Sequence, residues 1–134
     1  TKPSTEKRFY ILDLLQKKLL LSTYVAHGRG SGDNYAVAFS NRPGSYQSSL
    51  GFFRTGDTYM GKNGYSLFLD GLDKARERAI VVHGANYADP AVLKGQQRLG
   101  RSLGCPALPP DISKQVIDTI KGGVLLYIYG LNKA

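Results

Sequence analysis

Only one segment of the chain has the periodicity of an amphipathic helix, and this limits the fold more than any other feature. Residues 111–121 carry apolar side chains at helical spacing, with Asp111 positioned to cap the start and Gly122 and Gly123 positioned to end the helix. The expected apolar face consists of Ile112, Val116, Ile117 and Ile120.

The other apolar runs are short and rich in β-branched or aromatic residues, with turn residues between them, which is typical of strands. Residues 73–78 are long enough for one helical turn. The sequence therefore predicts a mainly β fold, a barrel or sandwich with one C-terminal helix. Strands are expected over residues 9–15, 18–26, 35–39, 50–55, 65–69, 79–82 and 124–129.

Length and composition favour one ordinary globular domain. The 134 residues are enough for one core and too few for two, so we expect a single domain over 1–134. Apolar residues make up 42% of the chain, and no apolar run reaches the length of a membrane span. The abrupt start at Thr1 suggests a trimmed N-terminus. The single cysteine excludes an internal disulfide and fits either redox compartment.

The net charge of +8 favours polyanionic partners. The basic residues are scattered, however, and the densest group, Lys74, Arg76 and Arg78, is interrupted by Glu77. No basic helix or aromatic-basic RNA motif is present. We therefore expect no nucleic-acid partner, and only a weak attraction of a generally basic surface to an anionic polymer.

Two loops qualify as candidates for a site. The glycine-rich segment 27–33 looks like a phosphate cradle, but it lacks the Gly-Lys-Ser/Thr ending of a P-loop and no helix follows, so we exclude that function. Residues 86–101 form a long polar stretch, and loops of this length in small domains are usually functional or mobile. We expect an active-site loop there.

Cys105 and His83 are a candidate nucleophile and base. The apolar run 79–82 ends at His83, and Cys105 follows Gly104, which leaves room for a reacting carbonyl. An imidazole close to a thiol can deprotonate it and stabilise the thiolate. The backbone N–H groups of Gly104 and Cys105, with Leu103 as a further donor, would stabilise an oxyanion. The alternative is that Cys105 is a small buried apolar residue.

Two familiar classes of cysteine enzyme are disfavoured, one by chain order and the other by a missing arginine. Both histidines precede Cys105, whereas papain-like hydrolases place the histidine far downstream of the cysteine. Sortases have the order seen here but need an arginine after the cysteine. Only lysines, at 114, 121 and 133, provide positive charge in that part of this chain.

The run from His83 to Ala85 together with Ser102-Leu103-Gly104-Cys105 resembles the signature of the bacterial L,D-transpeptidases. The resemblance is closest to the murein L,D-transpeptidase catalytic domain family. It extends from about Phe9 to Tyr129 and includes similar stretches at residues 27–32, 39–41, 48–51 and 100–102. The chain departs from the family at Leu103, where most members have histidine, at Ala107, where they have arginine, and in the longer loop between His83 and Cys105.

The resemblance implies a mostly β catalytic domain with Cys105 and His83 at one rim. Cys105 would form a thioester with a peptidoglycan tetrapeptide stem and pass the acyl group to an amine of another stem, without a cofactor. His83 would move the protons, oriented by the backbone carbonyl of Gly84. The chain would be an exported monomer of the periplasm or cell envelope, open to acylation by carbapenems. Water as acceptor, giving an L,D-carboxypeptidase or amide hydrolase, and a non-catalytic wall-binding domain remain as alternatives.

Several further residues are candidates for substrate contacts, each with a plainer alternative. Arg98 and Arg101 would pair with a stem carboxylate or remain solvated loop charges. Tyr59, Met60 and Tyr65 would line the donor cleft, as the resemblance implies, or pack in the core. Ser102 would lie beside the substrate and brace the nucleophile turn.

His27 is the second histidine of the chain, and we expect a polar loop residue rather than a substrate contact. A zinc site formed by His27, His83 and Cys105 is the less favoured alternative, because the spacing matches no common zinc pattern. We therefore predict no metal.

Overall fold

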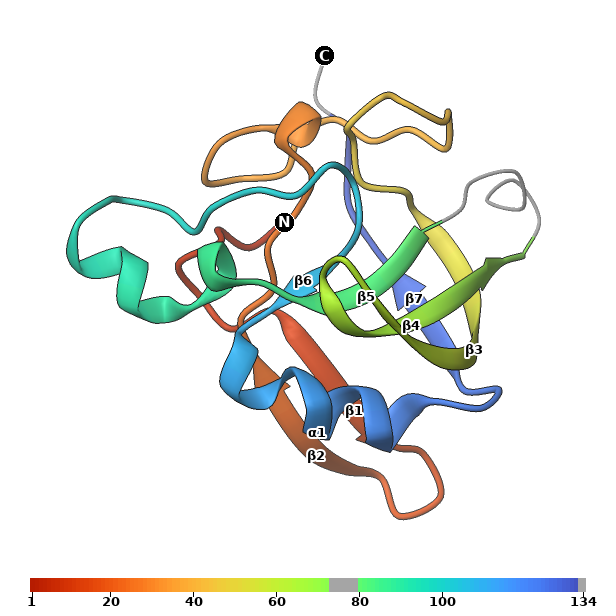
Figure 1. The fold of residues 1–134 in the computed structure, drawn as a ribbon. Helices are drawn as coiled ribbons and strands as arrows, with labels where there is room; N and C mark the ends of the chain where they lie inside the picture. Colours follow the sequence, from red (N-terminus) through yellow and green to blue (C-terminus); the bar gives the residue numbers. More distant parts are fainter. Residues whose placement is uncertain (73–79, 133–134) are drawn as a thin grey trace.

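The computed structural model describes residues 1–72 and 80–132, and its centre is a curled five-stranded sheet (Figure 1). The strand order is β6-β5-β4-β3-β7, with all neighbours antiparallel except β5 and β6, which are parallel. A separate two-stranded hairpin, β1–β2, and the helix α1 lie together on one side of this sheet (Figure 1). The strands are β1 (Phe9–Asp13), β2 (Lys18–Thr23), β3 (Gly51–Gly61), β4 (Gly64–Gly71), β5 (Ile80–Gly84), β6 (Ala107–Leu108) and β7 (Leu125–Ile128), and α1 is Pro110–Ile120.

The mainly β architecture with one C-terminal helix is confirmed. The hydrophobic core lies between the sheet and α1, where Leu67 and Val82 of the sheet pack in one cluster with Val116 and Ile117 of the helix. The hairpin adds Phe9 to the same cluster. Because successive side chains of a strand point to opposite faces, the position of Val82 in the core directs His83 to the other face of the sheet.

The helix confirms the expected apolar face but begins differently from the prediction. Val116, Ile117 and Ile120 are buried, as the spacing indicated. Asp111 is not the N-cap: Pro109 holds that position without a side-chain hydrogen bond, Pro110 begins the helix, and Asp111 lies in the first turn. Proline fits the first helical position because its fixed φ is already helical and its missing N–H has no partner there.

Residues 35–39 were expected to form a strand, and that prediction is wrong. The N–H groups of Val37 and Ala38 both donate to the carbonyl of Ser31, which ends the short 3₁₀ helix η1 (Arg29–Ser31). Phe39 makes only an isolated bridge to Ser48. The segment thus bonds to a neighbouring loop end instead of joining a strand ladder.

Other expectations are refined. Residues 86–101 contain two short 3₁₀ helices, η3 (Asn86–Ala88) and η4 (Pro90–Lys94), and the strand expected to end at residue 55 continues to Gly61. The helical turn expected over residues 73–78 lies outside the described residues. No helix in the described ranges has the length and apolar character of a membrane span.

Candidate active site

His83 is the second-last residue of β5 and has a fixed ring orientation. Its Nδ1 lies 2.9 Å from the carbonyl oxygen of Gly84. A carbonyl only accepts hydrogen bonds, so Nδ1 carries the proton and Nε2 of the neutral ring is left with its lone pair. The side chain is buried, at 5% exposure. The ring is therefore prepared to accept a proton through Nε2.

Gly84 also allows α1 to approach β5 closely. A Cβ at this position would lie 2.5 Å from the Oγ of Ser113 and 3.0 Å from its Cβ. A side chain at position 84 would therefore force the Ser113 hydroxyl to move and crowd the first turn of α1. The carbonyl that orients His83 is thus held in place by helix packing behind it.

Strand register brings the Cys105 turn to His83. His83 pairs with Ala107 in the parallel ladder between β5 and β6, and the N–H of His83 donates to the carbonyl of Pro106 at 3.4 Å. Cys105 directly precedes Pro106, is half-buried and is a free thiol. Two residues 22 positions apart in sequence are in this way placed at the same edge of the sheet.

The turn before Cys105 requires a glycine and is closed by Ser102. Gly104 has a φ of 130°, a conformation that L residues with a side chain rarely adopt. The buried Oγ of Ser102 accepts the N–H of Gly104 at 3.0 Å and donates to the carbonyl of Cys105 at 2.5 Å. The serine therefore braces the turn, in the way the sequence suggested.

This bracing changes the expected oxyanion site. The N–H of Gly104, one of the two expected donors, already has Ser102 Oγ as its acceptor. Of the expected donors, the N–H groups of Cys105 and Leu103 therefore have no acceptor among the described residues.

Tyr87 is a site residue that the sequence reasoning missed. Burial, and secondarily the negative charge of Cys105 when ionised, raise the pKa of Tyr87 to about 12, so the phenol stays protonated near the thiol. Gly100 holds it in place: its N–H donates to the Tyr87 carbonyl at 2.7 Å, and a Cβ there would lie 2.2 Å from that of Tyr87. The only sequence signal was its position four residues after His83.

The two tyrosines that were expected to line the cleft, Tyr59 and Tyr65, lie on opposite faces of the sheet. Tyr59 pairs with Ser66, which pairs with His83, so Tyr59 lies in the same row and on the same face as the histidine. Its ring stacks on Phe68 with centroids 4.3 Å apart. Tyr65 lies on the opposite face, where its hydroxyl donates to Asp118 of α1 at 2.6 Å.

Met60 pairs with Tyr65 and is 75% exposed, on the side of the sheet away from His83. Tyr59 is therefore the member of this group that the fold brings to the face of the candidate base.

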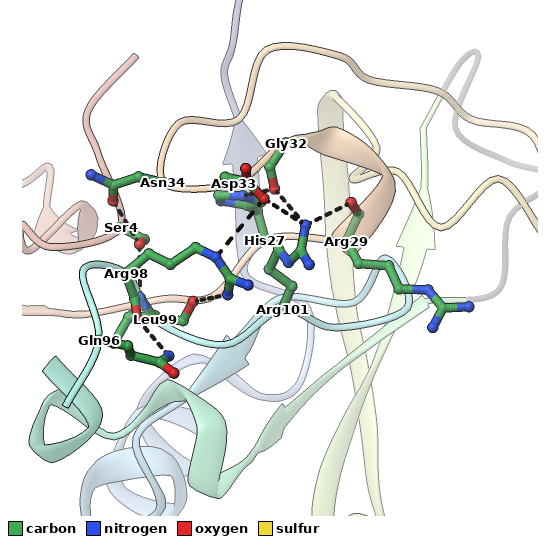
Figure 2. Close-up of polar contacts among 10 residues, drawn as sticks. All are labelled: Ser4, His27, Arg29, Gly32, Asp33, Asn34, Gln96, Arg98, Leu99 and Arg101. Carbon is green, nitrogen blue, oxygen red and sulfur yellow. Dashed lines mark hydrogen bonds and ion pairs between the residues drawn. The ribbon is translucent and has the colours of Figure 1, made fainter.

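Arg98 and Arg101 share one acidic partner, Asp33 (Figure 2). An Nη of Arg101 lies 3.0 Å from the Asp33 carboxylate and also donates to the carbonyls of Arg29 and Gly32 at 3.4 Å each. The Nε of Arg98 lies 3.9 Å from the same carboxylate. The Asp33 side chain is 81% exposed, so these pairs are weak and exchange easily with another carboxylate.

His27 is a loop residue, as expected, and its side chain is buried. Its Nδ1 accepts a hydrogen bond from Arg8 at 2.8 Å, and its Nε2 donates to the Gly32 carbonyl at 3.0 Å. Both ring nitrogens are occupied, so the arrangement gives no support to a zinc site with His83 and Cys105. No group of three possible metal-ligating side chains occurs within the described ranges.

Backbone hydrogen bonds join the loop that contains His27 to the segment that precedes Cys105. The N–H of Arg29 donates to the carbonyl of Ser102 at 2.7 Å, and the N–H of Ser102 donates to that of His27 at 2.9 Å. The loop that contains His27 therefore supports the segment that leads into Cys105.

The protonation of His27 predicts a pH dependence of stability. Burial, followed by the positive charge of Arg8, lowers the pKa of His27 to about 4 from its ordinary value of 6.5. The unfolded chain therefore takes up a proton below pH 6.5 that the folded chain does not, and stability falls as the pH drops from 6.5 to 4. We expect a loss of about 3 kcal/mol from this group.

Urea unfolding of the native chain and of His27→Gln between pH 7 and 4 measures this contribution. The variant, which lacks the titrating ring, should have a flatter profile than the native chain. Equal slopes for the two proteins would contradict the assignment of His27 as a buried neutral histidine.

Replacement of Ser102 by alanine should destabilise the nucleophile turn. The change leaves the Gly104 N–H and the Cys105 carbonyl without their buried partner, and we expect a loss of about 1–3 kcal/mol in the free energy of unfolding. Thr119→Ala is the matched control, because that residue is exposed and its hydroxyl bonds only to the Gln115 carbonyl of its own helix. If both variants unfold at the same urea concentration, Ser102 does not brace the turn.

Comparison with known proteins gives a family and a fold. The family model described as the L,D-transpeptidase catalytic domain matches residues 1–129. The solved structure of the L,D-transpeptidase LdtMt1 in complex with imipenem is 14% identical, with a TM-score of 0.51, and the match covers 84% of this chain and 50% of that one. This similarity shows a shared fold. No curated protein matches the sequence.

Two further solved structures are similar at lower scores. An L,D-transpeptidase from Mycobacterium smegmatis is 14% identical, with a TM-score of 0.49 and coverage of 84% of this chain and 50% of that one. The Ldtfm–avibactam carbamoyl enzyme is 17% identical, with a TM-score of 0.48 and coverage of 85% and 42%. The chain thus spans about half the length of the solved structures that it matches.

Proposed function

Because the chain belongs to the L,D-transpeptidase catalytic domain family, we propose that it transfers acyl groups between peptide stems of peptidoglycan through a thioester on Cys105. The observation that supports the proposal is the register of β5 and β6, in which His83 pairs with Ala107 and bonds to Pro106, the residue after Cys105. The hydrogen bond from His83 Nδ1 to Gly84 leaves the other ring nitrogen free to act as a base.

The proposed reaction has two halves. His83 Nε2 takes the thiol proton, and the thiolate attacks the carbonyl before the terminal D-alanine of a tetrapeptide stem. The N–H of Cys105 stabilises the oxyanion. The imidazolium then gives its proton to the leaving amine of D-alanine, and a thioester remains on Cys105.

In the second half, the amine of another stem attacks the thioester. That amine loses its proton to His83, the new amide bond forms, and the thiol of Cys105 is restored. No cofactor takes part in these steps. Water in place of the amine would make the same pair an L,D-carboxypeptidase, because only the acceptor differs.

Around the reacting groups, we propose that Tyr59 and Tyr87 form walls of the cleft. Tyr59 lies on the face of His83, and Tyr87 packs against the small cluster that contains Ala107, two residues after Cys105. Because the substrate is a wall polymer, the site of action would be the cell envelope. The basic surface, with a net charge of +8, would favour approach to an anionic wall.

We propose that Arg98 and Arg101 exchange Asp33 for a carboxylate of the stem. Their present partner is exposed and easily replaced. Arg101→Ala should then lower kcat/KM by about 10- to 100-fold, the range of one charge-assisted hydrogen bond, whereas Asp33→Asn should leave it equal or higher. Equal losses in the two variants would show that the ion pair only holds the loops together.

Product analysis tests the function as a whole. The purified chain is incubated with muropeptides that carry tetrapeptide stems, and the products are separated and weighed by mass spectrometry. Crosslinked dimers that have lost one D-alanine support the transferase, and trimmed monomers alone would make the protein a hydrolase. Unchanged muropeptides would contradict both activities and favour a non-catalytic wall-binding domain.

A carbapenem is a second acyl donor for the same thiol. The similar structure of LdtMt1 was solved in complex with imipenem. We expect the intact mass of the native chain to rise by one inhibitor mass, and that of Cys105→Ala to stay unchanged. An equal gain in the variant would locate the reaction at another group.

A further inference from the structure

A cavity lies between the start of β1 and the strand β7. Its volume is about 350 Å³, and its wall includes Pro106 but neither Cys105 nor His83. Phe9, Val25, Leu126 and Ile128 contribute much of the apolar lining. It is therefore a space next to the nucleophile turn that the proposed reaction does not use.

The cavity contains a positive charge that no acidic group neutralises. Arg8 donates from Nε and Nη2 to the carbonyl of Val25 at 3.1 and 2.7 Å, from Nη1 to that of Lys2 at 3.2 Å, and from Nη2 to His27 Nδ1 at 2.8 Å. Carbonyl and imidazole acceptors orient a guanidinium but carry no negative charge. Arg8 belongs to none of the ion pairs found among the described residues, and the cavity wall contains no Asp or Glu.

The burial of this charge disfavours the charged form of the side chain. Desolvation lowers the pKa of Arg8 to about 10. A cation in apolar surroundings is unfavourable unless an anion accompanies it. Lys2, at the mouth of the cavity, adds a second positive charge beside Tyr10. The wall thus combines two cations with apolar side chains.

Three sequence stretches meet at this cavity. They belong to the family resemblance and lie outside the Cys105 and His83 motifs. Residues 27–32, 39–41 and 48–51 contribute His27, Phe39 and Ser48 to the wall. The wall is also rigid, because Ser48 Oγ accepts the N–H of Gly28 at 2.9 Å and the Ser48 N–H donates to Ser31 Oγ at 2.8 Å. His27, Phe39 and Ser48 do not react in the proposed acyl transfer, and the cavity gives them a common location.

We propose that this cavity is a binding site for an organic carboxylate with an apolar portion. The carboxylate would pair with Arg8 and Lys2, and the apolar portion would pack against Phe9, Leu126 and Ile128. Two sources provide this chemistry: a peptide that ends in D-alanine, and a free acyl-chain carboxylate. Binding is non-covalent and does not require the thiol of Cys105.

Isothermal titration calorimetry with two probes tests the proposal. The probes are octanoate and N-acetyl-D-alanyl-D-alanine, each compared with an uncharged counterpart, octanol and the dipeptide amide. All titrations use Cys105→Ala, which prevents acylation and keeps the result independent of the proposed function. We expect at least one carboxylate to bind, and its uncharged counterpart to bind at least tenfold more weakly. The probe that binds identifies the source.

Three variants locate the binding. Arg8→Gln should weaken it at least tenfold, whereas Arg42→Gln, which removes an exposed loop charge, should not change it. Because Arg8 also supports two carbonyls, Ala36→Phe provides an independent check: it fills the cavity from another wall residue and should abolish binding with Arg8 in place. Absence of binding by both carboxylates, equal binding of the uncharged probes, or undiminished binding to Ala36→Phe would overturn the proposal.

Discussion

Replacement of Cys105 by alanine should reduce transfer between peptide stems by more than about a thousandfold, because the thioester cannot form without the sulfur. Turnover of tetrapeptide muropeptides by the variant, followed by mass spectrometry, measures the loss. The fold should persist, since Cys105 is half-buried at the end of a turn that Ser102 and Gly104 define. Thermal unfolding of the variant checks this.

Leu103→Ala is the matched control for Cys105→Ala. Leu103 is an exposed neighbour in the same turn, and its replacement should leave most of the activity intact. A Cys105→Ala variant that retains a tenth or more of the native rate would exclude Cys105 as the nucleophile.

Replacement of His83 by alanine should lower the transfer rate by about 10²–10⁴-fold, the usual contribution of a positioned general base. It should also slow the alkylation of Cys105 by iodoacetamide at neutral pH, because the thiol loses the group that accepts its proton. Alkylation followed by intact mass is the direct measurement, since it requires no substrate.

His27→Gln is the control that distinguishes a loss of thiol activation from a loss of stability. His27 connects Arg8 to the Gly32 carbonyl, so its replacement should lower stability while the folded protein keeps its alkylation rate. His83→Ala should show the reverse pattern. If the two variants slow alkylation equally, His83 has no special part in activating the thiol.

The predictable parts of the fold and site are those encoded by local patterns. Helical spacing identified the apolar face of α1, and an apolar run ending at His83 identified the strand β5 that positions it. Gly104 was singled out for the room it leaves beside Cys105, and its positive φ gives a second reason for a glycine at that position. In each case, neighbouring residues alone determine the conformation.

The remaining features depend on contacts between distant segments. Residues 35–39 have the composition of a strand, but their N–H groups bond to Ser31 instead. Arg101 finds Asp33 68 residues away, and Arg8 finds His27 across 19 residues. No spacing rule in the sequence specifies such pairs, because tertiary packing decides which loops meet.

The expected oxyanion site shows that contacts between residues close in sequence can also be missed by prediction from the sequence. The sequence placed two N–H donors at Gly104 and Cys105, and only the folded turn reveals that Ser102 already occupies the first. Tyr87 was missed because its position depends on how residues 86–101 fold, with Gly100 packed against it.

Capture of the covalent intermediate tests the proposed mechanism most directly. The native chain is mixed with a tetrapeptide donor in the absence of an acceptor amine, quenched in acid after a short interval and digested, and the peptide that contains Cys105 is weighed. We expect that peptide to gain the mass of the donor minus D-alanine, and the adduct to disappear when an acceptor stem is added before quenching. Turnover of the donor with no adduct on Cys105, or an adduct on any other residue, would contradict the proposed thioester mechanism.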